Sequence, residues 1–268
     1  MKVHCVKDLS GYVCLSLVFA YWIYGTIVPM KIILLPYYQM GVMKTHAVAF
    51  YMFFSIMTIA SLIRSAFFHP GKIPTYTGSM AQADWEYCSK CNQKRPPRSH
   101  HCKRCRHCVT RMDHHCPWIN NCVGEDNHFA FIQLIFYSIG LSIFAFAFCL
   151  SKSYKLPPCP SEFCSPESWF VIHERPLLIA AYIMSAIMSI SMVGLSCGQH
   201  FGIALDVTTL ETMISKDLVT LMLSRPERPM KHRYDILCGT KNVIKWLFPC
   251  RNRGLLITEK VFDGEDIV

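Results

Sequence analysis

Residues 88–122 read CSKCNQKRPPRSHHCKRCRHCVTRMDHHCPWINNC, and seven of these residues are cysteines. One pattern occurs in this segment twice, displaced by 14 residues: Cys, two residues, Cys, nine residues, His, six residues, Cys. The first copy consists of Cys88, Cys91, His101 and Cys108, and the second consists of Cys102, Cys105, His115 and Cys122. Because the two copies overlap, the chain must pass back and forth between two separate sites.

Each copy offers three thiolates and one imidazole, which is a ligand set of closed tetrahedral zinc sites. Zinc also suits a reducing cytosol, where disulfides do not persist. A polar segment of this length has little apolar core, so metal binding would supply much of its folding free energy. We therefore predict two structural Zn²⁺ ions. The alternative is an iron–sulfur cluster or a redox-active Cys-x-x-Cys pair, and the two histidines argue against it.

One cysteine is left over by this arrangement. Seven cysteines lie between Cys88 and Cys122, the eight ligands use six of them, and Cys116 remains. Asp113 and His114 precede it, so an imidazole is available to take the thiol proton and a carboxylate to fix the imidazole tautomer. We predict that Cys116 is a nucleophile, with His114 as its base and Asp113 as the orienting group. The alternative is a spare thiol packed beside the metal.

The rest of the chain is rich in apolar residues. It has 268 residues, 52% of them hydrophobic, and its charged fraction of 17% lies below the roughly 25% typical of soluble domains. Four apolar blocks, at about residues 11–29, 47–68, 129–150 and 177–204, are each long enough to span a bilayer as a helix. We predict an all-α polytopic membrane protein with four transmembrane helices. A cleaved signal peptide is the alternative for the first block, which lacks a cleavage site.

The expected organisation follows from these blocks and from the distribution of Lys and Arg. The parts are residues 1–68 (N-terminal segment and helices 1–2), 69–128 (cysteine-rich zinc domain), 129–205 (helices 3–4) and 206–268 (tail). Nine basic residues lie in 69–128 and ten in the tail, against three in residues 151–176. Basic segments stay in the cytosol. Both termini and the zinc domain are therefore expected there, and a disulfide between Cys159 and Cys164 is left open.

The string Asp113-His114-His115-Cys116 resembles the signature of the DHHC family of protein S-acyltransferases (palmitoyltransferases). The family pattern continues through Pro117, Trp118, Asn120, Asn121, Cys122, Val123, Gly124 and Asn127. Residues 208–211, TTLE, resemble its TTxE motif, and residues 234–246 resemble its C-terminal aromatic motif. One departure is His69-Pro70-Gly71, where many members have Asp-Pro-Gly. The resemblance covers nearly the whole chain.

What the resemblance implies is a two-step transfer. Cys116 would attack the thioester of palmitoyl-CoA, and the acyl group would then pass to a cytosolic cysteine of a membrane-associated protein. Arg95, Arg98 and His100 are candidates, by charge and by resemblance, to hold the CoA phosphates. A solvated basic face explains them equally well.

Three further residues of the resemblance have roles with ordinary alternatives. Trp118 would pack near the thioester, although an interfacial belt explains a Trp as well. Thr209 and Glu211 would buttress the zinc domain, with simple helix capping by Thr208 as the alternative.

Other classes of protein fit less well. A zinc-stabilised membrane adaptor would leave Cys116 inert. A metal transporter would need ionisable residues in the middle of its spans, which these spans lack. A nucleic-acid-binding protein would need a recognition helix after the basic segments, and none follows them, so we expect no nucleic acid partner. The last four residues, EDIV, resemble a PDZ-type ligand or are a plain acidic tail. Cys250 is either an acylation site or a free thiol. We place the protein in the Golgi, with the ER and plasma membrane as alternatives.

Overall fold

The computed structural model describes residues 4–73, 85–157 and 159–215. The described chain is mostly helical, and four apolar helices are long enough to cross a membrane: Leu9–Gln39, Thr45–Phe67, His128–Tyr154 and Glu174–Leu205. The cysteine- and histidine-rich region lies between the second and third of them. These features confirm the predicted fold class. The described chain clusters into two compact units, of which unit 1 contains residues 4–15, 62–73, 85–132 and 198–215 and unit 2 contains residues 16–61, 133–157 and 159–197.

The first span is longer than the sequence predicted. Helix α1 (Leu9–Pro29) ends at a proline, which has no N–H to donate and was the predicted end of the span. Instead, the chain continues through a π-helical turn, η1 (Met30–Leu34), into α2 (Leu35–Gln39). The wider turn preserves backbone bonding, with the Leu35 N–H donating to the Met30 carbonyl, and Ile33 and Leu34 are fully buried. Residues 40–44, rather than 30–46, connect the first two spans.

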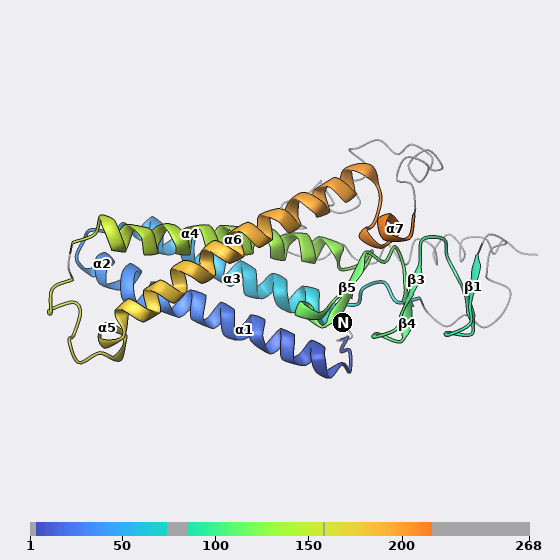
Figure 1. The fold of residues 1–268 in the computed structure, drawn as a ribbon, viewed down its shortest axis with the longest axis horizontal. Helices are drawn as coiled ribbons and strands as arrows, with labels where there is room; N and C mark the ends of the chain where they lie inside the picture. The colour runs from blue at the N-terminus through green and yellow to red at the C-terminus, as the bar shows by residue number, and fades with distance from the viewer. Residues whose placement is uncertain (1–3, 74–84, 158, 216–268) are drawn as a thin grey trace, which may run out of the picture. The chain divides into compact units, whose positions relative to one another are not determined.

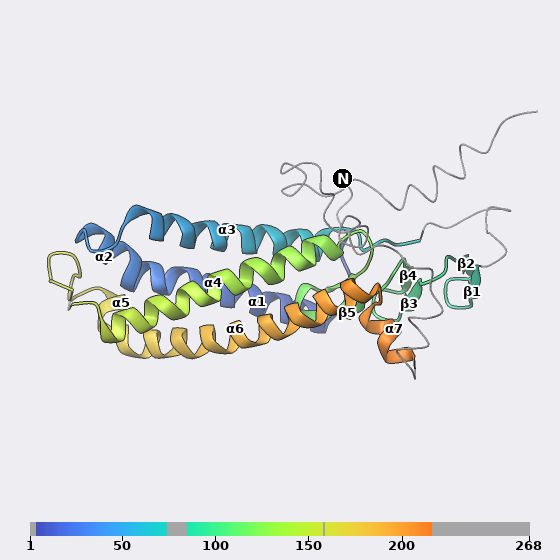
Figure 2. The same cartoon turned by 90° about the horizontal axis from the view of Figure 1, so that it is seen from above.

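Unit 2 consists mainly of the residues 16–61 and 133–197 of four helices: α1–α2, α3 (Thr45–Phe67), α4 (His128–Tyr154) and α6 (Glu174–Leu205), which lie together in a bundle (Figures 1 and 2). Lipid tails are as apolar as the side chains of these helices, so the hydrophobic effect does not drive the helices together. Close packing and interhelical hydrogen bonds must therefore stabilise the bundle. Tyrosine hydroxyls provide such bonds: Tyr51 donates to the Gly25 carbonyl and Tyr24 to the Leu177 carbonyl. Tyr51 is fully buried among aromatic and aliphatic side chains.

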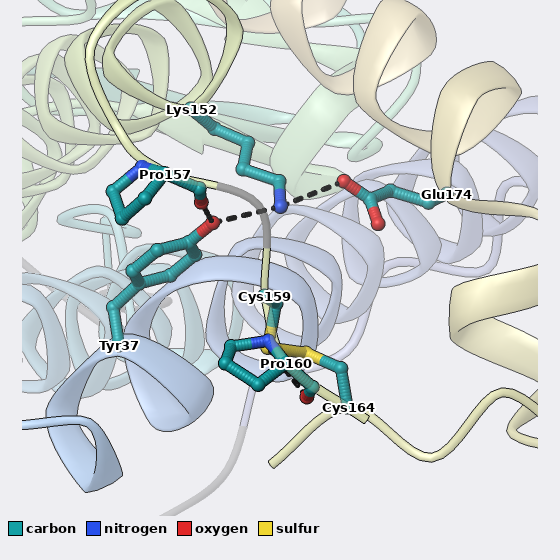
Figure 3. The surroundings of a disulfide bond; sticks show 7 residues. All are labelled: Tyr37, Lys152, Pro157, Cys159, Pro160, Cys164 and Glu174. Atoms are coloured by element: carbon teal, nitrogen blue, oxygen red, sulfur yellow. Dashed lines mark hydrogen bonds and ion pairs between the residues drawn. A yellow bond between two sulfur atoms is a disulfide. The ribbon is translucent and has the colours of Figure 1, made fainter. Parts of the chain in front are cut away.

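The loop between α4 and α6 carries a disulfide (Figure 3). The structure pairs Cys159 with Cys164, which the sequence had left open. Close to it, Lys152 donates to the Tyr37 hydroxyl (2.9 Å) and forms an ion pair with Glu174 (3.0 Å). These contacts join α2, α4 and α6, and a short helix, α5 (Trp169–Ile172), precedes α6.

Three small β-hairpins form the cysteine-rich part of unit 1. They pair β1 (Glu86–Cys88) with β2 (Gln93–Arg95), β3 (His100–Cys102) with β4 (His107–Val109), and β5 (His114–Cys116) with β6 (Asn121–Val123). Each hairpin turn contains a residue in the left-handed region: Asn92 (φ 52°), Arg106 (φ 59°) and Asn120 (φ 47°). These three positions are 14 residues apart, so the sequence repeat is also a structural repeat. The structure extends it from two copies to three.

Candidate active site and metal centres

Consecutive hairpins share each metal-binding group. The first hairpin contributes Cys88 from the end of β1 and Cys91 from its turn, and the strands of the second contribute His101 and Cys108, which are register partners. The second group repeats this arrangement with Cys102, Cys105, His115 and Cys122. Within each group the ligand atoms all lie within 4.8 Å of one another. The structure therefore contains two Cys₃His metal-binding sites, made of the eight residues that the spacing predicted.

The distances between donor atoms fit a tetrahedral ion. With Zn–S bonds of about 2.3 Å and Zn–N bonds of about 2.1 Å, the edges of the tetrahedron are about 3.8 Å for S–S and about 3.6 Å for S–N. The Cys91–Cys108 sulfurs are 3.6 Å apart, and the Cys105–Cys122 sulfurs are 3.3 Å apart. His115 Nδ1 lies 3.4–3.7 Å from the three sulfurs of its group. A disulfide would require about 2.0 Å, so these thiols are arranged for a metal.

Cys116 occupies the metal-ligand position of the third hairpin. It pairs with Asn121 across the hairpin, as Cys102 pairs with His107 and Cys88 pairs with Gln93 in the other two. The position three residues later, which is a cysteine in the first two hairpins, is Ile119 in the third, and its side chain is buried. The third hairpin therefore has the first cysteine of the Cys-x-x-Cys pair that the other two hairpins use for metal binding, but it lacks the second. Cys116 is a buried free thiol.

His114 links this sulfur to a carboxylate. Its Nδ1 lies 2.8 Å from Asp113 Oδ2, and it also forms a hydrogen bond with Cys116, for which Nε2 is the remaining ring nitrogen. Burial by itself would lower the pKa of His114. The hydrogen bonds to Asp113 and Cys116 and the Asp113 charge outweigh burial and raise this pKa to about 9. The ring edge also contacts Phe131, with centroids 5.4 Å apart.

The Asp113 carboxylate is held by the segment after α6. Thr209 donates twice, from its backbone N–H to Oδ1 (2.6 Å) and from its hydroxyl to Oδ2 (3.1 Å). The Leu210 N–H donates to the Asp113 carbonyl (3.0 Å). Burial would raise the pKa of Asp113, but its hydrogen bonds with His114, Thr209 and Gln199 hold that pKa well below its usual value. Thr209, which was predicted to support the zinc domain, therefore binds the Asp113 carboxylate directly.

The same segment is anchored to the cysteine-rich hairpins by ion pairs. Thr208 and Glu211 form a capping box at the start of α7 (Thr209–Ile214), so the capping alternative for Thr208 also holds. Glu211 in addition receives Arg98 Nε (2.8 Å) and Nη2 (3.0 Å). Arg98 and Arg111 both bind Asp206, just after α6. This four-residue network fixes where α7 begins.

The four predicted CoA contacts differ in their surroundings. Arg95 pairs across the first hairpin with Glu86 (2.7 Å), and Arg98 binds the two carboxylates described above. His100 lies on β3 and is half-buried. Trp118 lies on the short 3₁₀ helix η2 (Pro117–Ile119) and is 54% exposed. Arg98 is thus occupied by protein carboxylates, whereas Trp118 presents an open aromatic face.

Several buried polar residues were not given a role from sequence. Asn121 and Asn127 are fully buried, and both donate to the Ser65 carbonyl at the end of α3. Gln199 donates to Asp113 Oδ2 (3.0 Å). The available signal for Gln199 was its polarity within the fourth apolar block. The C-terminal aromatic motif, Cys250 and the EDIV terminus lie outside the described residues.

Four membrane-length helices and two Cys₃His groups define a multi-pass membrane protein with a metal-binding domain. The DHHC palmitoyltransferase family matches residues 81–216. Palmitoyltransferase ZDHHC21 of Danio rerio is 41% identical over 255 residues, that of Mus musculus 37% over 256 and that of Homo sapiens 37% over 258, each covering 94% of both chains. The chain therefore belongs to the DHHC palmitoyltransferase family and is a protein S-acyltransferase.

Proposed function

We propose that the protein transfers palmitate or another long-chain acyl group from acyl-CoA to protein cysteines through an acyl-enzyme on Cys116. The assignment rests on the hydrogen bonds that link Asp113 through His114 to Cys116. In addition, the third hairpin lacks the second cysteine of a metal-binding Cys-x-x-Cys pair, so the Cys116 sulfur is not a metal ligand. A thiol used for metal binding would not be free to attack. The family and its relatives, which are named palmitoyltransferases, support palmitoyl-CoA as donor.

In the first step, the Cys116 sulfur attacks the thioester carbonyl of the donor. His114 takes the thiol proton, and its hydrogen bond to Asp113 stabilises the imidazolium that forms. The new S–C bond forms, the bond to CoA sulfur breaks, and His114 gives its proton to the departing CoA thiolate. The product is a Cys116 thioester and free CoA.

In the second step, a cysteine of the acceptor protein attacks the Cys116 thioester. His114 takes the acceptor's proton, the acyl group moves to the acceptor sulfur, and the proton returns to Cys116 as it leaves. Asp113 holds the imidazole by Nδ1 throughout and stabilises its charged form, which is the role of a triad carboxylate.

The two Cys₃His groups would hold structural Zn²⁺. All four protein positions of each group are filled, so the ions would be closed sites that fix the hairpins rather than bind substrate. The ligands His115 and Cys122 flank Cys116 in sequence and are paired across the third hairpin. Zinc would therefore hold the backbone that carries the nucleophile.

The expected orientation places the zinc domain and both termini in the cytosol. The hairpins and the Cys159–Cys164 loop are separated in the chain by one apolar helix, α4, so a single crossing by α4 would place them on opposite sides of a membrane. A disulfide loop suits the oxidising side, and metal-bound thiolates suit the reducing side. The distribution of Lys and Arg supports the same orientation.

We propose the Golgi as the compartment, with membrane-associated proteins as acceptors. A palmitoyl chain gains roughly 12 kcal/mol in apolar surroundings, at about 0.8 kcal/mol for each of about fifteen methylenes. Donor and product are therefore both held at the membrane, and so are the acceptors that can be reached.

A PDZ-type partner for the EDIV terminus remains a secondary proposal that rests on the sequence alone.

The test is acylation of the purified full-length protein. Wild type, Cys116→Ser and Cys5→Ser, which removes an exposed thiol as the matched control, are incubated with palmitoyl-CoA and a membrane-bound peptide acceptor. We expect CoA release and acceptor labelling from wild type and Cys5→Ser, and neither from Cys116→Ser with unchanged metal content. Turnover by Cys116→Ser would refute the nucleophile. A wild type that labels once and stops would make the inert adaptor the better account.

A further inference from the structure

Asp113 has a second support, which comes from the membrane helices rather than from the TTLE segment. Gln199, near the end of α6, donates from Nε2 to Asp113 Oδ2 (3.0 Å). His128, the first residue of α4, is hydrogen-bonded through Nε2 to Gln199 Oε1 (2.7 Å). Gln199 and Asp113 are 5% and 3% exposed, respectively. The result is a buried chain of contacts from His128 through Gln199 and Asp113 to His114.

The direction of each hydrogen bond in this chain follows from chemistry. An ionised carboxylate only accepts, so the Gln199 amide must turn its NH₂ toward Asp113 and its oxygen toward His128. The His128 Nε2 must then carry a proton and donate to that oxygen. The amide can form both bonds in one orientation only, and His128 selects that orientation. A glutamine without this neighbour could rotate its amide away.

The two oxygens of Asp113 are positioned by different groups. Oδ1 is held by the backbone N–H of Thr209 (2.6 Å). Oδ2, the oxygen closest to His114 Nδ1, is held by the Thr209 hydroxyl (3.1 Å) and by Gln199 (3.0 Å). Gln199 therefore acts on the oxygen that orients the imidazole. His128 and Phe131 lie one turn apart on α4, and Phe131 contacts the His114 ring, so α4 supports both ends of the Asp113–His114 pair.

We propose that Gln199, oriented by His128, is a positioning residue that fixes Asp113 and thereby His114 for the attack by Cys116. This inference rests on the proposed acyl-enzyme mechanism. Gln199 is too buried to touch acyl-CoA, so its effect belongs in the rate of acylation and not in the binding of the donor. Losing one hydrogen bond to a charged acceptor at the reacting group corresponds to about a tenfold to hundredfold lower rate.

The experiment measures single-turnover acylation of full-length protein by palmitoyl-CoA, with donor concentration varied and metal content determined for each variant. Gln199→Met keeps the length of the side chain and removes both hydrogen bonds. We expect its maximal acylation rate to fall about tenfold to hundredfold, with half-saturating donor concentration and two metal ions per chain unchanged. Gln199→Glu, which cannot donate to Asp113 when ionised, should lose at least as much.

His128→Phe provides the second part of the test. Since His128 is proposed to act through Gln199, its variant should lose less than Gln199→Met, and the double variant should be no slower than Gln199→Met alone. Gln133→Met is the matched control: it makes the same change at another buried glutamine, on α4, and should keep the wild-type rate.

Each other outcome overturns the inference. A wild-type rate in Gln199→Met would show that Thr209 suffices to hold Asp113. A rise in half-saturating donor concentration or a loss of metal would show a role in binding or folding instead. Additive losses in the double variant would show that His128 acts independently. If wild type itself fails to form a Cys116-dependent acyl-enzyme, the proposed function fails first, and that result is distinct from all of these.

Discussion

Substituting Arg98 by leucine separates two roles for this residue, a contact with CoA phosphates and a clamp on α7. Arg98 donates two hydrogen bonds to Glu211, at 2.8 and 3.0 Å, and reaches both Asp206 carboxylate oxygens at 3.3 Å. The Glu211 side chain is 8% exposed and that of Arg98 is 24% exposed. If Arg98 holds α7 in place, its replacement would leave the Glu211 and Asp206 carboxylates, which are poorly exposed to solvent, with one cation fewer.

The magnitude follows from how far the network is buried. Exposed ion pairs contribute about 0–1 kcal/mol, whereas breaking a fully buried pair costs about 3–5 kcal/mol. The Arg98 network lies between these limits, so we expect Arg98→Leu to lower the free energy of unfolding of the cysteine-rich unit by about 2–3 kcal/mol. For a unit of this size such a loss lowers the melting temperature by on the order of 10 °C.

The assay follows thermal unfolding through the reaction of buried thiols with a fluorogenic maleimide, and in parallel the KM for palmitoyl-CoA. The clamp predicts lower stability, lower kcat because α7 no longer holds Thr209 against Asp113, and an unchanged KM. Arg95→Leu is the matched comparison, since its partner Glu86 is 69% exposed and the pair should contribute about 1 kcal/mol or less.

A single pattern of results would refute this reasoning. If Arg98→Leu melts like wild type while its KM rises about tenfold or more, the guanidinium binds phosphate and the carboxylate contacts are incidental. A raised KM in Arg95→Leu alone would instead assign the phosphate contact to that residue.

Three further predictions test other parts of the structure. Thr209→Val removes the hydroxyl bond to Asp113 but keeps the backbone bond, so we expect about a tenfold lower acylation rate, while Thr209→Ser should retain wild-type activity. Cys159 and Cys164 should resist alkylation until reductant is added, and replacing both by serine should cost up to about 2 kcal/mol because the closed loop is short; alkylation without reductant would contradict the disulfide. His101→Ala should reduce bound zinc from two ions to one and unfold the first hairpin, as measured by metal analysis and proteolysis; an unchanged zinc content would remove His101 from the ligand set.

The features that depend on local spacing could be predicted from the amino-acid sequence. Membrane spans were visible because the bilayer requires about twenty consecutive apolar residues, whatever the helices then contact. The two metal sites were visible because knuckle ligands recur at fixed short intervals, and Cys116 was visible because a spacing rule accounts for every other cysteine of that segment. The structure showed in addition that this period continues into a third hairpin, in which Asn120 repeats the left-handed backbone conformation of Asn92.

The residues that support the Asp113–His114 pair from distant parts of the chain could not be predicted in this way and became known from the fold. Thr209 and Gln199 reach Asp113 across 96 and 86 residues of sequence, and no local period records such contacts. Arg98 was a candidate phosphate contact by charge and by resemblance, with a solvated basic face as the alternative, yet its partners in the fold are Glu211 and Asp206. The physical reason is that ligand spacing and hydrophobicity are properties of neighbouring residues. Hydrogen bonds between separate segments depend on where the packed helices and metal-bound hairpins bring the chain back together.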